Sequence, residues 1–260
     1  MRLDQALVYR GLLPSRERAK AAIQAGEALV NGREACKPSV EIADSDKLSL
    51  RETHTWVGRG YLKLRKALDG FAIDVAGKSC VDVGASTGGF TQLLLERGAA
   101  KVCAIDVGTG QLAVSLRADP SVVNLEKTDF RTVARSQAGA PDFASVDVSF
   151  ISLQLIFPNL HRILGNDGQA VCLLKPQFET GAPVKHGIVK DPKAHIRVIT
   201  EVCGAARQAG FSIRGLTHSP IAGGEGNIEF LLHLSKNACD PDDAIPIDDI
   251  VKLAWEDLKT

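Results

Sequence analysis

The sequence lacks an excess of charge of either sign, and it lacks any long apolar run. Its 31 lysine and arginine residues balance 31 aspartate and glutamate residues. The chain is therefore not basic throughout, as many nucleic-acid-binding proteins are, and any such contact must come from a local patch. No apolar stretch approaches the roughly 20 residues needed to cross a bilayer, and the charged start Met1–Asp4 is unlike a signal peptide. We expect a cytoplasmic protein without stable membrane association.

Cysteine and histidine are too scattered to build a metal centre. The six cysteines include no Cys-x-x-Cys pair, and several lie inside apolar runs, as buried thiols in a reducing compartment do. The histidines show no metal-ligand spacing. The sequence therefore predicts core thiols and no metal site.

The most informative stretch of the chain runs from Ser79 to Thr91. Val81 and Val83 indicate a buried strand, the glycines that follow indicate a tight turn, and apolar residues from Phe90 onward open a helix. Such a strand–turn–helix unit lets backbone amides and a helix N-terminus approach a nucleotide-like ligand.

One residue of this turn argues against a dinucleotide. Gly84 and Gly89 are in place, but Ser86 occupies the position where a glycine would let the backbone press against a pyrophosphate. A side chain there suits an adenosine ligand without phosphates, such as S-adenosylmethionine (SAM), and Asp82 would suit its ammonium group. NAD and a purely structural turn remain the alternatives. The turn residues that we expect to contact the cofactor are Gly84, Ser86, Thr87, Gly88, Gly89 and Phe90.

Strand-like and helical stretches alternate through most of the remaining chain. Such alternation predicts a mostly parallel sheet with helices on both faces. The last two strands follow each other without room for a helix, so the final strand should be antiparallel. This seven-stranded, Rossmann-like α/β arrangement resembles the class I SAM-dependent methyltransferase fold. The predicted strands are 79–84, 101–106, 121–126, 142–147, 169–174, 211–216 and 228–234.

Two carboxylates follow strands of this predicted sheet. Asp106 ends the second strand about twenty residues after the glycines, a position suited to a ribose diol. Asp129 follows the third strand and is placed to meet an adenine amine. A helix cap or an ordinary loop charge is the alternative for each.

Residues 1–52 form a unit with its own pattern. Leucines at helical spacing predict a first helix, Ser15 is placed to cap a second helix from Arg16, and Asn31-Gly32 indicates a tight hairpin turn. Basic residues outnumber acidic ones across the two helices. As a charge pattern alone, this is more typical of a solvated helix face than of a binding site.

The order of residues in this unit resembles the S4 domain, a small RNA-binding module. The resemblance rests on Arg-Leu-Asp-Gln-Ala-Leu, then Ser-Arg-Glu-Arg-Ala-Lys-Ala-Ala-Ile-Gln-Ala-Gly, then Val-Asn-Gly-Arg. It implies a small α+β domain that recognises folded RNA by phosphate and shape. The residues to which it assigns RNA contact are Arg2, Arg16, Arg18, Lys20 and Arg33.

These patterns divide the chain into four parts. Apolar residues at helical spacing in the last part predict a short docked helix, and its acidity would repel RNA, so we assign it no substrate role. The parts are an S4-like domain over 1–52, a linker over 53–58, a methyltransferase-like domain over 59–236 and an acidic segment over 237–260.

Four ionisable residues lie at predicted strand ends or on the helix before the first strand, where an open α/β sheet places its site. They are Lys63, Asp147, Lys175 and Glu229. A buried lysine such as Lys175, directly after an apolar strand, is costly unless it is paired or neutral. Methyl transfer to a ribose hydroxyl needs a base, and a lysine serves if a second ammonium nearby favours its neutral form. On spacing alone, structural ion pairs fit equally well.

In order and strand context, these four residues resemble the Lys-Asp-Lys-Glu tetrad of FtsJ-type ribose 2′-O-methyltransferases. With the S4-like unit and the segments Asp-Val-Ser-Phe-Ile-Ser-Leu, Lys-Pro-Gln-Phe-Glu and Gly-Asn-Ile-Glu, the chain resembles the TlyA family from Met1 to about Ser235. The resemblance implies SAM-dependent 2′-O-methylation of cytidine in 16S or 23S ribosomal RNA, with rRNA or ribosomal subunits as partners. It also implies Lys175 as the base, with the other three residues in positioning roles and Asp147 also beside the cofactor.

Other functions stay open at this point. A catalytically silent RNA-binding or ribosome-binding factor would have the same fold without turnover, and Ser86 disfavours an NAD-dependent oxidoreductase. Members of the family are also called hemolysins. The sequence shows neither a spanning segment nor the strongly amphipathic apolar helix of a membrane-active protein.

Overall fold

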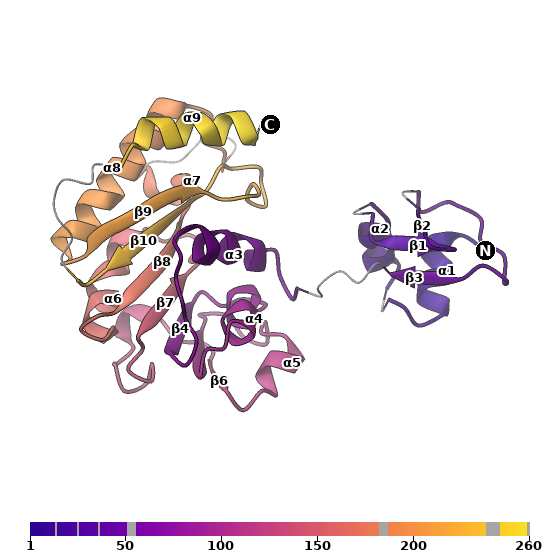
Figure 1. Cartoon of the computed structure of the whole chain (residues 1–260), viewed down its shortest axis with the longest axis horizontal. Helices are drawn as coiled ribbons and strands as arrows, with labels where there is room; N and C mark the ends of the chain where they lie inside the picture. Colours follow the sequence, from indigo (N-terminus) through magenta and orange to yellow (C-terminus); the bar gives the residue numbers. More distant parts are fainter. Residues whose placement is uncertain are drawn as a thin grey trace. The chain divides into compact units, whose positions relative to one another are not determined.

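The computed structural model describes residues 1–13, 15–24, 26–35, 37–50, 56–181, 187–237 and 245–258. The chain separates into two compact units, Met1–Trp56 and Val57–Thr260 (Figure 1). Each unit has its own hydrophobic core, as expected for independently packed domains.

The N-terminal unit packs two helices on a small antiparallel sheet. Asn31 and Gly32 join β1 to β2 with φ angles of 53° and 77°, the left-handed conformations that a two-residue hairpin turn requires. The predicted Asn-Gly turn is therefore confirmed. Leu3, Leu7 and Ile23 from the two helices are fully buried in the core. The elements are α1 (Leu3–Tyr9), α2 (Arg16–Gln24), β1 (Ala28–Val30), β2 (Arg33–Glu34) and β3 (Leu48–Leu50), with strand order β2-β1-β3.

The larger unit is built on a seven-stranded sheet with the order β6-β5-β4-β7-β8-β10-β9. Within this sheet β4, β5, β6, β7 and β8 pair in parallel, and β10 pairs antiparallel with both β8 and β9. The predicted fold class, with an antiparallel last strand, is confirmed. The strands are β4 (Ser79–Val83), β5 (Lys101–Ile105), β6 (Val122–Leu125), β7 (Phe143–Val146), β8 (Gln169–Leu174), β9 (Ser212–His218) and β10 (Phe230–Ser235).

Helices cover both faces of this sheet, so its strands are apolar on both sides. One face packs against the side chains of α6, α8 and α9, and α3 and α4 contact strands of the other (Figure 1). The helices are α3 (Gly60–Gly70), α4 (Gly89–Glu96), α5 (Val114–Arg117), α6 (Phe157–Ile163), α7 (Pro176–Glu179), α8 (Pro192–Gln208) and α9 (Ile247–Asp257), and the 3-10 turns are η1 (Phe130–Thr132) and η2 (Leu153–Leu155).

The helix expected in the acidic C-terminal segment is present as α9. Val251 and Ala254 of this helix are buried in the main core, and the Trp255 Nε1 donates a hydrogen bond to His195 Nδ1 of α8 at 3.1 Å.

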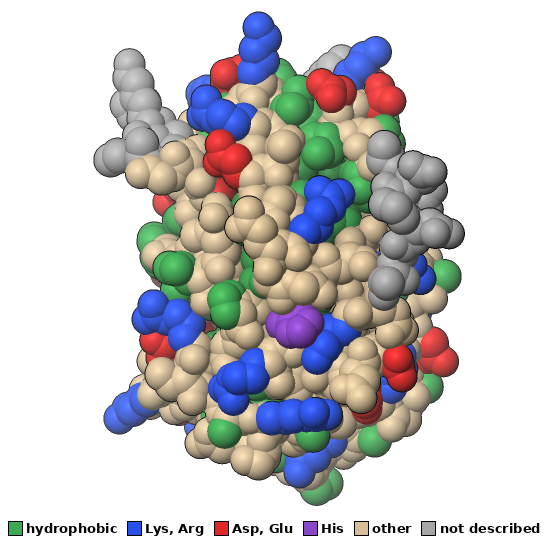
Figure 2. Space-filling view, turned by 90° about the vertical axis from the view of Figure 1, so that its left-hand side faces the viewer, with side chains coloured by type: hydrophobic (Ala, Val, Ile, Leu, Met, Phe, Trp, Pro, Cys, Tyr) green, Lys and Arg blue, Asp and Glu red, His purple; other side chains and the backbone are tan. Residues whose placement is uncertain are grey.

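The charge of the protein is balanced in total but uneven over its surface, because Lys and Arg side chains gather around a histidine on the lower part of the face in Figure 2.

Candidate active site

The glycine turn after β4 is shaped by its contact with the end of β7. Gly84 has a φ of 81°, and a Cβ atom there would collide with the backbone carbonyl of Asp147. Only glycine meets both demands without strain. The missing side chain lets the carboxyl ends of β4 and β7 come together, with the Asp147 backbone N–H donating to Val83 O at 2.8 Å.

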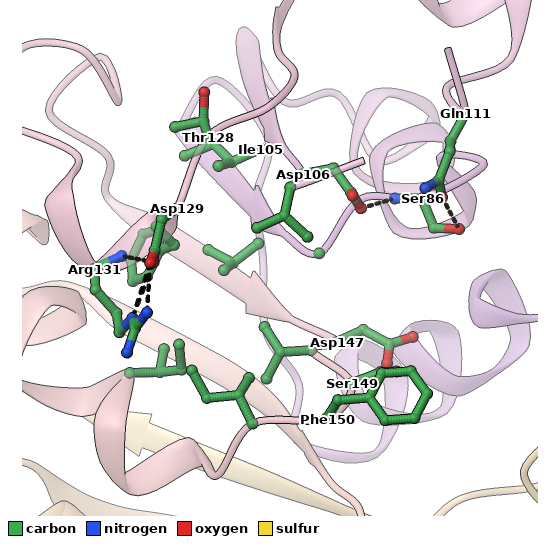
Figure 3. Close-up of a pocket in the computed structure, with 17 residues that line it drawn as sticks. Ser86, Ile105, Asp106, Gln111, Thr128, Asp129, Arg131, Asp147, Ser149 and Phe150 are labelled. Carbon is green, nitrogen blue, oxygen red and sulfur yellow. Dashed lines mark hydrogen bonds and ion pairs between the residues drawn. The ribbon is translucent and has the colours of Figure 1, made fainter. Parts of the chain in front are cut away.

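Ser86 joins this turn to the end of β5. Its backbone N–H donates to Asp106 Oδ2 at 2.8 Å, while Asp106 Oδ1 accepts from the Gly108 N–H at 2.7 Å. The Ser86 hydroxyl donates to Gln111 Oε1 at 3.2 Å (Figure 3). Ser86 has a φ of 48°, so a non-glycine residue holds a left-handed conformation that these contacts support.

A hollow of about 430 Å³ opens at the carboxyl ends of β4, β5 and β7, and we call it the main hollow of this site. A volume of this size is typical of small-molecule sites. Its polar groups include the carboxylates of Asp106, Asp129 and Asp147, and Phe150 lies beside Ser149 at one end (Figure 3). Apolar side chains such as Ile105 and Ile156 line the rest. The combination of apolar walls with a few carboxylates suits a nucleoside.

A side hollow of about 200 Å³ adjoins the main one, and Gly84, Ser86 and Asp147 line both. Its wall brings the N-terminus of α4 next to α3, because a Cβ at Gly89 would meet Gly58 O and the Tyr61 N at 3.0 Å. Five more residues of this wall are relevant to the site: Arg59, Lys63, Ala85, Thr87 and Phe90. Gly88, at the start of α4, has a φ of 97°.

Two lysine–carboxylate pairs meet at this edge of the sheet. Lys63 Nζ lies 2.6 Å from Glu229 Oε2, and the two side chains are only 9% and 3% exposed. Lys175 Nζ lies 2.6 Å from Asp147 Oδ1, with side chains 11% and 22% exposed, and donates to the Ser149 hydroxyl at 2.9 Å. Buried charges of this kind require the partners they have.

The sheet register explains why the two pairs lie near each other. Leu174 of β8 is opposite Phe230 of β10, so Lys175 and Glu229 occupy the next position at the same edge. Lys63 and Asp147 both line the side hollow. Lys175 lines neither hollow, but it contacts Asp147 and Ser149, which do. The structure thus brings all four predicted residues together.

Comparison with known proteins shows the family to which the chain belongs. An FtsJ-like methyltransferase family matches residues 56–236, and the S4 domain family matches residues 1–48. The "16S/23S rRNA (cytidine-2′-O)-methyltransferase TlyA" of Mycobacterium tuberculosis is 44% identical, covering 90% of this chain and 89% of that protein. The chain belongs to the TlyA family.

Relatives in this family carry two kinds of name. "Hemolysin A" of Brachyspira hyodysenteriae is 38% identical, covering 90% of this chain and 99% of that protein. A solved structure from Streptococcus thermophilus is 43% identical with a TM-score of 0.78, and the match covers 100% of this chain and 97% of that one. No helix in the described part of the chain is long and apolar enough to span a membrane.

Asp82 is placed differently from the expectation that it faces a cofactor's ammonium group. Its carboxylate is fully buried, accepts hydrogen bonds from the hydroxyls of Thr91 at 2.7 Å and Ser145 at 3.0 Å, and lines neither hollow. Burial raises the pKa of Asp82 to about 7. In this TlyA-family chain, Asp82 ties α4 to β4 and β7.

Asp129 lines the main hollow, as expected, but its carboxylate is already engaged. Both oxygens pair with the Arg131 guanidinium, at 2.6–3.1 Å, and one also caps η1. This pairing lowers the pKa of Asp129. Of the two expected carboxylates, Asp106 is therefore the one that faces the hollow without a cationic partner among the contacts that the structure describes.

The predicted RNA-contacting residues of the S4 domain fall into two groups. Arg2 and Arg16 both pair with the buried Asp4, at 3.1 and 2.9 Å, while about half of each side chain remains exposed. Lys20 and Arg33 are exposed. The side chain of Arg18 lies outside what the structure describes. Arg2 and Arg16 thus have a structural role in addition to any contact with RNA.

Three functional candidates were not apparent from the sequence. Ser149 accepts a hydrogen bond from Lys175, and Phe150 is 91% exposed with a φ of 63°, rare for a bulky residue. The Phe150 ring lies 5.0 Å from that of Phe178. Glu179 is buried, and burial raises its pKa. These residues lie in the two segments that carry Asp147 and Lys175, which is the only signal the sequence offers.

No metal-holding group of three His, Cys, Asp or Glu residues occurs among the described residues.

Proposed function

We propose that this protein transfers a methyl group from SAM to the 2′-hydroxyl of a cytidine in 16S or 23S ribosomal RNA. The observation that carries the proposal is the pair of lysine–carboxylate contacts beside a nucleoside-sized hollow. The 44% identity to an enzyme named for this reaction supports the choice of substrate.

The main hollow fits the adenosine part of SAM. Gly84 has no side chain and lines the cavity with its backbone, and apolar side chains including Ile105 and Ile151 line it as well. The Asp106 oxygens each accept one backbone hydrogen bond, and a carboxylate oxygen has a further lone pair for a ribose hydroxyl. When bound, SAM supplies the electrophilic methyl group on its sulfonium.

Lys175 is our candidate for the base that takes the proton of the ribose hydroxyl. To act as the base, Lys175 must be a neutral amine, whose lone pair takes the hydroxyl proton and becomes an ammonium. Asp147 lies 2.6 Å from Lys175 Nζ, so its carboxylate stabilises the ammonium that this step forms. The Ser149 hydroxyl, at 2.9 Å, fixes the direction of the amine. Together these contacts hold the Nζ atom at one place beside the hollow.

Lys63 provides a positive charge at the site. It lines the side hollow and is held by Glu229, in a buried position where charges act more strongly than in water. Its ammonium is therefore suited to stabilise negative charge developing on the ribose oxygen. The S4 domain, with exposed Lys20 and Arg33, supplies contacts to RNA phosphates.

Tritiated methyl transfer from SAM tests this proposal directly. Wild-type protein and Lys175→Ala are incubated with purified ribosomal subunits and with protein-free rRNA. We expect label at ribose 2′-O positions with the wild type alone, and a SAM Kd for Lys175→Ala within a few-fold of wild type. SAM binding without label on any RNA would instead favour a catalytically silent ribosome-binding factor. Unchanged turnover by Lys175→Ala would remove this residue from the mechanism.

A further inference from the structure

Glu179 is a buried carboxylate that the proposed chemistry does not use. It is 6% exposed, ends the short helix α7 and lines neither hollow. Its Oε2 accepts a hydrogen bond from the Ser152 hydroxyl at 2.6 Å, and its Oε1 accepts one from the Leu153 backbone N–H at 2.8 Å. Both partners lie about 26 residues earlier in the chain.

The two segments that Glu179 joins both carry residues of the site. Helix α7 begins directly after Lys175. Ser152 follows the residues Ser149–Ile151, which line the main hollow. The same segments also meet where Lys175 donates to Ser149 and where the Phe178 and Phe150 rings lie 5.0 Å apart. Glu179 therefore adds a third contact between the segment that carries Lys175 and the segment that forms one wall of the main hollow.

The segment that forms this wall has a strained backbone, so contacts with other segments must hold it in place. Phe150 holds a φ of 63° and is 91% exposed, and a strained backbone of this kind persists only where surrounding contacts fix it. The Leu153 N–H, at the start of η2, lies in a buried hydrogen bond and has Glu179 as its acceptor. A buried N–H without an acceptor would be costly, so loss of the carboxylate would favour a different loop conformation.

We propose that Glu179 is a positioning residue, which holds the segment Ser149–Leu153 in register with Lys175. The catalytic part of this inference rests on the proposed function, whereas the effect on the loop does not. Glu179 acts through its neighbours, since it contacts Ser152 and Leu153 and not the hollow.

The test compares Glu179→Ala and Glu179→Gln with wild type, with Glu201→Gln on the exposed side of α8 as the matched control. The glutamine keeps an acceptor for the Leu153 N–H and a donor for the Ser152 oxygen. The readouts are amide hydrogen exchange in the peptide 148–153, kcat and KM with rRNA, and SAM Kd.

We expect Glu179→Ala to speed exchange at Leu153 and to lower kcat, each at least tenfold, with a smaller change in KM. Glu179→Gln and Glu201→Gln should stay within about threefold of wild type in every readout. If Glu179→Ala does not fold, Ser152→Ala removes one of the two hydrogen bonds and should show the same pattern at a smaller size.

Two results would overturn the inference. Unchanged exchange in 148–153 in a folded Glu179→Ala protein would show that the carboxylate does not hold the loop. Faster exchange with unchanged kcat would show that the loop is held but that its position does not matter for catalysis. If the wild type transfers no methyl group at all, the proposed function fails, and the exchange comparison still decides whether Glu179 holds the loop.

Discussion

The Lys63–Glu229 pair allows a quantitative test of how the site is built. Its side chains are 9% and 3% exposed with the charged atoms 2.6 Å apart. Removing one partner leaves the other charge buried and unpaired, which costs about 3–5 kcal/mol. For a unit of this size that corresponds to a fall in Tm of about 10 °C. Replacing both with apolar residues removes both desolvation penalties and should recover most of the loss.

Calorimetry on Lys63→Met, Glu229→Leu and the double variant measures these terms as a double-mutant cycle. The control is Asp69→Asn, which breaks the Asp69–Arg97 pair of the same 2.6 Å length but with side chains 53% and 40% exposed, so its cost should stay below about 1 kcal/mol. Methyl transfer should be lost in all three site variants, the stable double variant included. If the single variants lower the free energy of unfolding no more than Asp69→Asn does, the reasoning is refuted, because the Lys63–Glu229 pair would then be solvated.

Further predictions concern other parts of the molecule. Phe150→Gly relieves a φ of 63° and should raise the free energy of unfolding by about 1 kcal/mol while lowering kcat/KM for RNA; equal stability in urea unfolding would argue against strain there. Burial raises the pKa of Asp82 from 3.8 to about 7, so between these values the folded state binds more protons than the unfolded state and stability falls as pH rises, by up to about 1.4 kcal/mol per pH unit. Asp82→Asn should flatten this slope in unfolding curves collected across that range, and a slope that persists would assign it to another group. Lys20→Ala and Arg33→Ala should each reduce the slope of log Kd against log salt by about 0.7–0.9 in RNA-binding titrations without changing Tm, and an unchanged slope would place that residue away from phosphate.

The sequence pattern was sufficient for the fold, because each element depends on local chemistry. Alternating apolar strands and helices predicted the parallel sheet, and the Asn31-Gly32 pair predicted a turn whose φ angles are indeed positive. Three of the four ionisable residues, Asp147, Lys175 and Glu229, were found because strand ends are recognisable in the sequence and gather at one edge of the sheet. Lys63 lies on α3 and was found through the resemblance to the Lys-Asp-Lys-Glu tetrad. The pairing between them depends on register, which the sequence pattern did not specify.

Other features depend on contacts between distant segments. The burial of Asp82 follows from helices on both faces of the sheet, and its flanking valines in a parallel strand were a usable signal. The left-handed conformation of Phe150 depends on how β7 joins η2, and nothing in its neighbours' identities indicates it. The partners of Glu179 lie about 26 residues away, so its contacts were visible only in the folded chain.

The place of β10 in the sheet has a consequence for how the protein is made. It is the last strand in the chain, yet it lies between β8 and β9, so both of these present unpaired edges until residues 230–235 have left the ribosome. Such edges are prone to pair with other chains. Lys63, synthesised early, also waits for Glu229 from the start of that region. A nascent chain therefore stays incompetent, and in need of protection, until almost all of the domain has been translated.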